Sequence, residues 1–357
     1  MRVLQLVTAF QYRGAEIAAL QFSRELVTHG HIVLYASLYS STDDFVIYPG
    51  IESKCLNGRK HPLLDTSLLK ALAQLIKDFR PDIVQANAGD TLKYAAIASF
   101  LQSKHYKLVF RNASTVSRYM RSSAQRLFNR FLYSRVDKIL SVSQESKRDL
   151  LAVFPQLTDR VKVVPNGINI ATVTRPTPHG SVVSLVHVGG FSFEKNHLGL
   201  IRIFQRVLVE VPEAKLNLVG QGSLMSQIRE KVSEQGLKDS VHFHGATKEA
   251  LKFIAAADVL VLPSVIEGLP GVVLEAFLCM TPVVAYDVGG ISEVLINNET
   301  GWLIKPGDEI GFSNAIVEAI KSNDQRKLIA ARRLVVDKYD VAKLAVQVID
   351  EYNFLNR

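Results

Sequence analysis

Short apolar runs rich in β-branched residues alternate with amphipathic patterns along the entire chain. In the stretch 15–28, for example, Ile17, Leu20 and Leu26 recur near helical spacing, and Gly30 follows as a helix stop. Continuously apolar strands that alternate with helices form parallel sheets covered by helices on both faces. The sequence therefore predicts a doubly wound α/β fold. The expected strands are 3–8, 32–38, 82–87, 107–112, 138–143, 161–165, 183–188, 215–219, 241–244, 259–263, 282–286 and 302–304.

The length of 357 residues suits two domains of ordinary size. A stretch at 172–180 contains two prolines and a glycine among polar residues and has no clear periodicity, which is typical of a linker. We therefore expect two Rossmann-like domains, 1–170 and 171–340, and a C-terminal helix in 341–357 that packs back toward the first domain. Sheets of this kind bind ligands beyond the carboxyl ends of their strands, so we expect the domains to face each other across a ligand cleft.

The cysteines and the N-terminus bear on the cellular compartment. Cys55 and Cys279 are the only cysteines, far apart and in no metal-ligand spacing, which favours a reducing compartment. The first residues lack the long apolar core of a signal peptide, and no apolar run approaches the length that spans a bilayer. These features predict a cytoplasmic protein.

The net charge of +8 is unevenly distributed along the chain. Residues 1–170 hold 23 Lys and Arg against 13 Asp and Glu, whereas residues 171–357 hold 19 against 21. Between Asp90 and Asp137 there is no carboxylate at all, although nine Lys and Arg lie there. A basic half attracts nucleic acid, anionic lipid or a phosphorylated substrate, and charge alone leaves these alternatives open.

Two loops that follow predicted strands carry residues suited to phosphate. Gly14 follows the first strand and opens a helix, where backbone N–H groups can face an anion; a tight turn is the alternative. Lys195 lies in a loop beyond Gly189, at the end of the strand 183–188, and lysine serves as a mobile point charge for phosphate groups. A solvated surface lysine is the alternative there.

The most informative segment is 257–287, which reads as a buried strand, a glycine-rich loop and a helix. Pro270 suits a helix start because it has no N–H that would lack a partner, and the N–H groups of 271–273 would then point at an anion. Glu267 lies in the loop, and Glu275 lies about one turn into the helix. Two carboxylates beside a phosphate site suggest hydroxyl ligands, ribose on one side and a sugar on the other. A helix-start Glu near the helix dipole is the alternative for either residue.

Other phosphate, hydrolase and metal motifs are absent from the sequence. Gly220 and Gly222 follow a strand, but the third glycine of the dinucleotide fingerprint is missing. Neither a Gly-x-x-x-x-Gly-Lys-Ser/Thr loop nor a Gly-x-Ser-x-Gly elbow occurs, and the nine histidines form no metal spacing. His242 and His244 alternate on one predicted strand, as structural or ligand-edge groups.

In order and spacing, these motifs together resemble the retaining glycosyltransferases of family 4, which have the two-Rossmann-domain GT-B architecture. The resemblance covers nearly the whole chain and is densest in the second half. Glu267 and Glu275 stand as the Glu-x₇-Glu pair of that family. The other matching segments are 14–16, 142–146, 165–169, 218–222, 243–246, 281–285 and 289–293.

The resemblance implies a role for each matching residue. Lys195 would bind the diphosphate of a nucleotide-sugar donor, Glu275 the ribose, and Glu267 the transferred sugar; Lys195 and Glu267 would be the catalytic residues. Transfer would retain the anomeric configuration without a metal, onto a saccharide or lipid-linked acceptor in cell-surface polysaccharide or lipopolysaccharide synthesis. The full implied donor set is Gly14, Gly189, Lys195, Gly220, His244, Glu267, Gly268, Leu269, Gly271 and Glu275.

The chain departs from the family pattern at three places. Gly190 stands where the family usually has an arginine, so one phosphate cation is missing and donor binding is put in doubt. Where the first domain often offers a histidine, this chain has Asn87 at one strand end and Arg111 and Asn112 at another. We assign these three residues to the acceptor side. Met280 stands where glycine is common, a matter of packing.

The segment 116–135 reads as a basic amphipathic helix, with Met120, Leu127, Phe128, Phe131 and Leu132 expected on one side. Such a helix suits a peripheral contact with an anionic membrane at its inner face. The alternative is a helix that packs its apolar side on the sheet. A GT-B epimerase or phosphorylase is a rival reading of the whole chain, as is a nucleic-acid-binding protein, for which the sequence shows no recognisable binding module.

Overall fold

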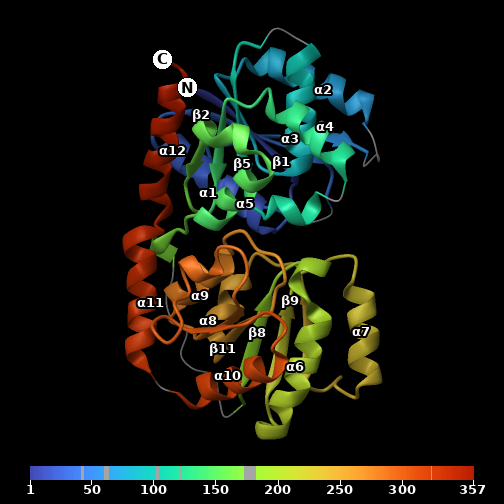
Figure 1. Ribbon diagram of the computed structural model, residues 1–357, viewed down its shortest axis with the longest axis vertical. Coiled ribbons are helices and arrows are strands. Elements are labelled where there is room, and N and C mark those ends of the chain that lie inside the picture. The colour runs from blue at the N-terminus through green and yellow to red at the C-terminus, as the bar shows by residue number, and fades with distance from the viewer. Residues whose placement is uncertain (42–43, 60–63, 102–103, 121, 173–181, 323) are drawn as a thin grey trace. The chain divides into compact units, whose positions relative to one another are not determined.

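The computed structural model describes residues 1–41, 44–59, 64–101, 104–120, 122–172, 182–322 and 324–357. The chain forms two compact units (Figure 1). Unit 1 contains Met1–Asn169 and Val341–Arg357, and unit 2 contains Ile170–Asp340. The predicted linker 172–180 lies, beyond Thr172, outside the described residues.

Unit 1 is built on a seven-stranded sheet in the order β3-β2-β1-β4-β5-β6-β7, with every neighbouring pair parallel. Its strands are β1 Arg2–Ala9, β2 Ile32–Tyr39, β3 Glu52–Gly58, β4 Ile83–Ala86, β5 Lys107–Asn112, β6 Lys138–Ser141 and β7 Val161–Val163. Its helices are α1 Gly14–Thr28, α2 Thr66–Phe79, α3 Gly89–Leu101, α4 Ser123–Tyr133, α5 Gln144–Val153 and α12 Val341–Leu355, with 3₁₀ turns at Val116–Tyr119 and Pro155–Arg160.

The strands of unit 1 are buried on both faces, because successive side chains point to opposite sides of a sheet. Along β1, Leu4 and Leu6 join the core beneath α2 and α3, whereas Val3 and Val7 join the core beneath α1 and α12. Complete burial of one such side chain contributes about 1.5–3 kcal/mol to folding. The helix α12 therefore belongs to the core of unit 1, although unit 2 separates it from α1–α5 in the sequence.

Unit 2 has a six-stranded sheet in the order β10-β9-β8-β11-β12-β13, again parallel throughout. Its strands are β8 Ser184–Val188, β9 Lys215–Val219, β10 Val241–Gly245, β11 Val259–Leu262, β12 Val283–Tyr286 and β13 Trp302–Ile304. Its helices are α6 His197–Glu210, α7 Met225–Glu234, α8 Ala250–Ala256, α9 Gly271–Cys279, α10 Glu309–Lys321 and α11 Gln325–Lys338, with 3₁₀ turns at Ile170–Thr172, Phe193–Lys195 and Ile291–Glu293.

The predicted fold class is confirmed, and all twelve expected strands occur within one or two residues of their predicted ends. Two local predictions were wrong. The sequence did not predict β3, and the expected single helix over 116–135 is a 3₁₀ turn followed by α4. Of its apolar residues, Leu132 is buried whereas Leu127 is exposed. None of the described helices is long and apolar enough to cross a membrane.

Candidate active site

In each sheet there is one position at which the strand order reverses. On one side of it the successive strands of the chain are added in one direction, and on the other side they are added in the opposite direction. This switch lies between β1 and β4 in unit 1 and between β8 and β11 in unit 2. In open α/β sheets, ligands bind beyond the carboxyl ends of the strands at such a switch point. Lys195 follows β8 and Glu267 follows β11, so the two predicted catalytic residues lie on the two loops at the switch point of unit 2.

Three contacts join these two loops. The Asn196 amide donates to the carbonyl oxygen of Pro263 at 3.1 Å. The Val265 N–H donates to the carbonyl oxygen of Glu194 at 2.8 Å. Between them, Lys195 Nζ lies 2.5 Å from Glu267 Oε1. Since the first two hydrogen bonds hold the loops together, the ammonium and the carboxylate meet in a fixed place.

The Lys195–Glu267 ion pair is largely buried, with side-chain exposures of 21% and 9%. A buried charge needs a partner and further hydrogen bonds to balance its loss of hydration. Lys195 has three N–H donors, and Glu267 accepts one of them, so others remain to bind phosphate oxygens. The pair therefore presents a positioned cation at the strand ends.

Two glycines make room for this arrangement. An ideal Cβ on Gly189 would lie 3.2 Å from Cδ and Cε of Lys195, so a side chain there would displace the lysine stem. Gly220 has φ +146°, and a Cβ on it would lie 2.0 Å from the carbonyl oxygen of Gly189. Only glycine allows this approach of the loop after β9 to the loop after β8. Both predicted glycines therefore shape the site.

The helix α9 begins beside Glu267. Pro270 is its N-cap residue rather than its first helical residue, and its carbonyl oxygen accepts the N–H of Val273 at 3.2 Å. The prediction that residues 271–273 all offer donors was therefore too broad, because only Gly271 and Val272 remain. The preceding Gly268 is fixed by Gly290, whose N–H donates to its carbonyl oxygen at 2.7 Å. Leu269 is buried.

Glu275 lies in the second turn of α9 and is partly buried. Among the described residues, its carboxylate makes neither an ion pair nor a side-chain hydrogen bond. Burial raises the pKa of Glu275 to about 7. Such a carboxyl is suited to accept hydrogen bonds from ligand hydroxyls, which would favour its ionised form.

His187 and His197, which the sequence reasoning missed, lie beneath the Lys195 loop. Their rings meet edge to face at 4.8 Å, and His197 also stacks on Phe191 at 4.1 Å. Burial lowers the pKa of His187 to about 4 and that of His197 to about 2, so both are neutral at pH 7. The two histidines therefore support the loop without competing for an anion. Their spacing alone gave no signal of this packing.

His244, another predicted donor residue, has different partners. Its Nε2 lies 2.7 Å from Asn217 Oδ1, and its ring lies 4.4 Å from that of Phe253. It belongs to the edge strand β10, separated from β8 by β9. Its part in donor binding stays a prediction.

In unit 1, Gly14 begins α1 next to the switch point between β1 and β4. An ideal Cβ on Gly14 would have no neighbour within 4 Å, so packing does not require glycine there. A ligand close to the backbone would require it, and this assignment stays a prediction.

The side chain of Arg111 lies in the interior of unit 1, and the residue is 4% exposed. Its Nη2 donates to the carbonyl oxygen of Pro165 at 2.8 Å and to Asn166 Oδ1 at 3.0 Å, and its guanidinium lies 4.8 Å from the ring centre of Phe22. Its Nε and Nη1 have no hydrogen-bond partner in the described part of the chain. Burial lowers the pKa of Arg111 to about 10, which leaves it cationic at neutral pH.

Asn87 and Asn112 are also buried, and both amides bond within the unit. Asn87 donates to Gln5 Oε1 at 2.9 Å and accepts from Gln85 Nε2 at 2.8 Å. Asn112 donates to the carbonyl oxygen of Ser146 at 3.1 Å. These bonds fix the strand ends, and contact of Asn87, Arg111 or Asn112 with an acceptor stays a prediction.

The site of unit 2 thus combines a positioned cation, two helix-start N–H groups and two carboxylates. Within the described residues, no group of three or more His, Cys, Asp and Glu side chains is placed to hold a metal ion. The cation and the N–H groups can neutralise a diphosphate, and the carboxylates can accept hydrogen bonds from hydroxyls.

Solved structures share this architecture over the whole chain. HepE of Anabaena, crystallised with UDP and glucose, superposes with a TM-score of 0.83 at 20% identity, over 99% of each chain. The fold is therefore GT-B, the two-domain architecture of many glycosyltransferases.

Sequence comparison then identifies the family. The profile of glycosyl transferases group 1 matches residues 183–322, and that of glycosyltransferase family 4 matches residues 12–172. The chain belongs to the group 1 glycosyltransferases of the GT-B fold.

Two curated relatives are also similar in sequence. A 2-deoxystreptamine N-acetyl-D-glucosaminyltransferase of Streptomyces fradiae is 26% identical, over 93% of this chain and 91% of its own length. An uncharacterised glycosyltransferase of Methanocaldococcus jannaschii is 27% identical over 64% of this chain, and the match spans 62% of that relative's length.

Proposed function

We propose that this protein transfers a hexose-type sugar from a nucleoside diphosphate sugar to a saccharide or lipid-linked acceptor, with retention of the anomeric configuration. The observation that carries the proposal is the buried Lys195–Glu267 pair at the switch point of unit 2, 2.5 Å between Nζ and Oε1. A positioned cation held beside a carboxylate matches a donor whose charged diphosphate adjoins a sugar rich in hydroxyls. The complex of HepE with UDP and glucose supports a uridine donor.

In this proposal, the residues of unit 2 stabilise the departing nucleoside diphosphate. Lys195 and the N–H groups of Gly271 and Val272 compensate the negative charge that grows on the leaving phosphate oxygen. Glu275 accepts hydrogen bonds from the ribose, and Glu267 holds the sugar. The acceptor hydroxyl attacks from the side of the leaving group and gives its proton to the diphosphate, so the configuration is retained. Gly190 supplies no second cation, so Lys195 carries more of the charge compensation.

We also propose that the protein works at the inner face of a membrane, in cell-surface polysaccharide or lipopolysaccharide synthesis. The exposed apolar and basic side chains of the segment 116–135 support this placement. Binding to anionic vesicles but not to neutral ones at low salt is the expected result. Equal binding to anionic and neutral vesicles would contradict the proposed contact with an anionic membrane.

The first test of the donor is a thermal-shift screen against UDP, GDP, their sugar conjugates and NAD. A ligand at about 100 times its Kd adds about 2.7 kcal/mol to the free energy of unfolding. Stabilisation by one nucleoside diphosphate and its sugar conjugate is expected. Stabilisation by NAD alone would contradict the proposal.

Product analysis tests the reaction. With the donor that stabilises the protein, NMR of the glycoside should show the same anomeric configuration as the donor sugar. An inverted product would refute retention, and an isomerised donor would favour the epimerase. Because charge compensation is assigned to Lys195 and α9, a chelator should leave turnover unchanged; activity that returns only with added metal would refute that assignment.

A further inference from the structure

The helix α4 presents large apolar side chains to solvent. Only Leu132 and Tyr133 of this helix are buried. Leu127, Phe128 and Phe131 are 70%, 42% and 48% exposed. Residues one, three and four positions apart in this way lie along one helix face, so these three form a continuous stripe. A contiguous apolar stripe at the surface marks an interaction site.

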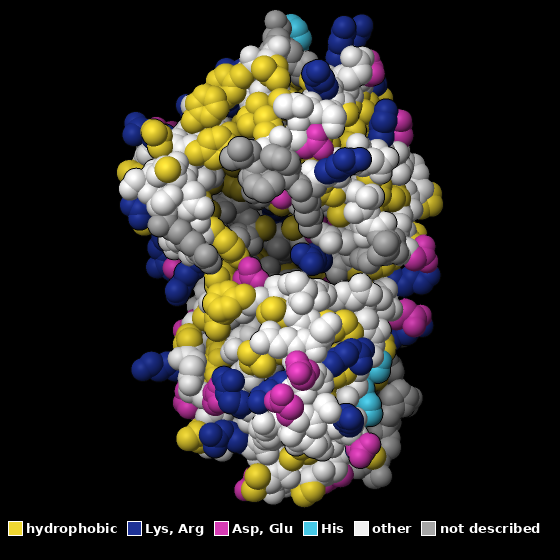
Figure 2. All heavy atoms as spheres, turned by 90° about the vertical axis from the view of Figure 1, so that its right-hand side faces the viewer, with side chains coloured by type: hydrophobic (Ala, Val, Ile, Leu, Met, Phe, Trp, Pro, Cys, Tyr) yellow, Lys and Arg dark blue, Asp and Glu magenta, His cyan; other side chains and the backbone are white. Residues whose placement is uncertain are grey.

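The C-terminal end of α3 extends this stripe. Phe100 stacks on Phe131 with ring centres 4.5 Å apart and planes at 7°, and Leu101 is 65% exposed. Phe100, Leu101, Leu127, Phe128 and Phe131 together form what we call the α3–α4 surface. On the molecular face in Figure 2, hydrophobic side chains gather into patches with Lys and Arg side chains at their edges.

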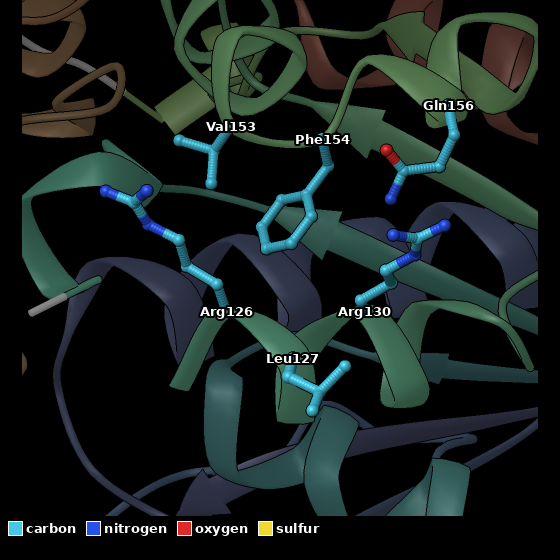
Figure 3. Close-up of a pocket in the computed structure, with 6 residues that line it drawn as sticks. All are labelled: Arg126, Leu127, Arg130, Val153, Phe154 and Gln156. Atoms are coloured by element: carbon cyan, nitrogen blue, oxygen red, sulfur yellow. The ribbon is translucent and has the colours of Figure 1, made fainter. Parts of the chain in front are cut away.

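A pocket of about 230 Å³ adjoins the stripe, between α4 and the segment that follows α5. Figure 3 shows Arg126 and Arg130 extending from α4 on either side of the Phe154 ring. Phe154 is 3% exposed and packs edge to face against Tyr133 at 5.0 Å, so it forms a rigid apolar floor. Leu127, Val153 and Gln156 complete the lining.

The charged side chains of α4 itself are all basic. Arg126 and Arg130 are exposed, and none of the ion pairs among the described residues includes either of them. No Asp or Glu occurs in the sequence between Asp90 and Asp137. Two guanidinium groups, four residues apart on one helix and beside an apolar stripe, suit an anionic group that is attached to acyl chains.

A second copy of this chain fits the surface less well. Most homodimers are symmetric, so the same patch of both copies would meet. That arrangement would bring Arg126 and Arg130 of one copy toward the same arginines of the other, without carboxylates between them.

We propose that the α3–α4 surface lies in the headgroup region of an anionic bilayer, and that the pocket of Arg126 and Arg130 holds the phosphate of a phospholipid. The inference rests on the proposed membrane contact and assigns its residues and its ligand. The apolar stripe enters the acyl boundary, and the arginines remain at the level of the phosphates. Residues of the consecutive helices α3 and α4 act together.

Sedimentation of the full chain with vesicles of phosphatidylglycerol and phosphatidylcholine tests the pocket. Each arginine near an anionic surface strengthens binding about fivefold, so Arg126→Gln/Arg130→Gln should bind roughly 25-fold more weakly. Leu127→Ser/Phe128→Ser should weaken binding as well. Arg206→Gln and Val209→Ser, exposed positions of unit 2, are the matched controls and should bind like the wild type. All variants should keep the wild-type thermal shift with the nucleotide sugar.

A second measurement locates the contact. Phe128→Trp should show indole fluorescence quenched by brominated acyl chains, whereas Trp302, buried in unit 2, should not be quenched. Wild-type binding by the arginine variant would overturn the pocket while leaving the membrane contact standing. Equal binding to vesicles that carry fatty-acid carboxylate at the same charge density would overturn the phosphate assignment. Self-association lost in the Leu127→Ser/Phe128→Ser variant would show instead a surface for a second copy.

Discussion

The raised pKa of Glu275 makes the stability of the protein depend on pH. Its pKa is about 7 in the folded protein because burial disfavours the charged form, whereas an unfolded glutamate titrates near 4.5. Between these values the folded state binds more protons than the unfolded state, so stability falls as pH rises from about 4.5 to 7. Glu275→Gln should therefore raise the melting temperature above pH 7 and leave it unchanged near pH 4. The exposed Glu318→Gln is the control, and a constant difference across the pH range would contradict this account.

If Glu275 binds the donor as proposed, the same carboxyl should make donor binding pH-dependent. Ligand hydroxyls donate to the ionised form, so binding must first release the proton that Glu275 holds below about pH 7. The affinity for a nucleoside diphosphate sugar, whose diphosphate is esterified at both ends and does not titrate there, should rise between pH 6 and 8. Calorimetry in two buffers should detect proton release. Glu275→Gln should bind more weakly and lose the pH dependence; a variant that kept it would place the titrating group elsewhere.

We expect the loss of Lys195 to destabilise the protein only while Glu267 stays charged. We expect the same loss to abolish donor binding whether or not Glu267 is charged. Lys195→Met leaves a carboxylate buried without its cation, which typically costs about 3–5 kcal/mol. Lys195→Met/Glu267→Gln should recover much of that loss in urea unfolding, because the amide carries no charge. Neither variant should respond to the nucleotide sugar, whereas Lys238→Met, at an exposed site, should respond fully. Donor binding by the double variant would contradict the assignment of Lys195 to the diphosphate site.

At the scale of single residues, sequence spacing predicted which side chains follow the strands of unit 2, and the resemblance to family 4 assigned them to one site. Lys195, Glu267 and Glu275 follow recognisable strand, loop and helix signals, so their placement needed no coordinates. The direct contact of Lys195 with Glu267 was not predictable, because it depends on how two loops distant in sequence meet. The packing of His187 against His197 was not predictable either, because it also depends on how distant segments meet. Burial lowers the pKa of both histidines.

At the scale of elements, one buried hydroxyl adds to the apolar packing of α12 on the sheet of unit 1. Tyr352 donates to Gln85 Oε1 at 2.6 Å and is fully buried. Tyr352→Phe should lower the free energy of unfolding by about 1 kcal/mol in a urea titration, since a buried hydrogen bond is lost. Tyr12→Phe removes an exposed hydrogen bond to the Asp44 carbonyl and should change it little. Equal effects of the two changes would show that burial of the Tyr352 hydroxyl is immaterial.

The sequence did not predict features for which the local hydrophobic pattern differs from what the tertiary structure imposes. The strand β3 is an edge strand paired only with β2, and its sequence ESKCLNG is largely polar and exposed. Hydrophobic periodicity finds strands that are buried on a face, so it misses such an edge. In α4 the pattern correctly indicated an amphipathic helix. The sequence did not show that the apolar side faces solvent, because that depends on how α3 and α5 cover the sheet.

At the scale of the molecule, the chain leaves unit 1 after Asn169, forms unit 2, and returns at Val341. The proposed donor contacts of Lys195, Glu267 and Glu275 all lie in unit 2. A nucleotide sugar at about 100 times its Kd should therefore stabilise unit 2 against unfolding. Amides in peptides of 170–340 that exchange only when unit 2 unfolds should then exchange roughly 100-fold more slowly. Peptides from 1–169 and 341–357 should change less. The Lys195→Met/Glu267→Gln protein is the control, and equal protection in both units would show that the chain opens as one cooperative body.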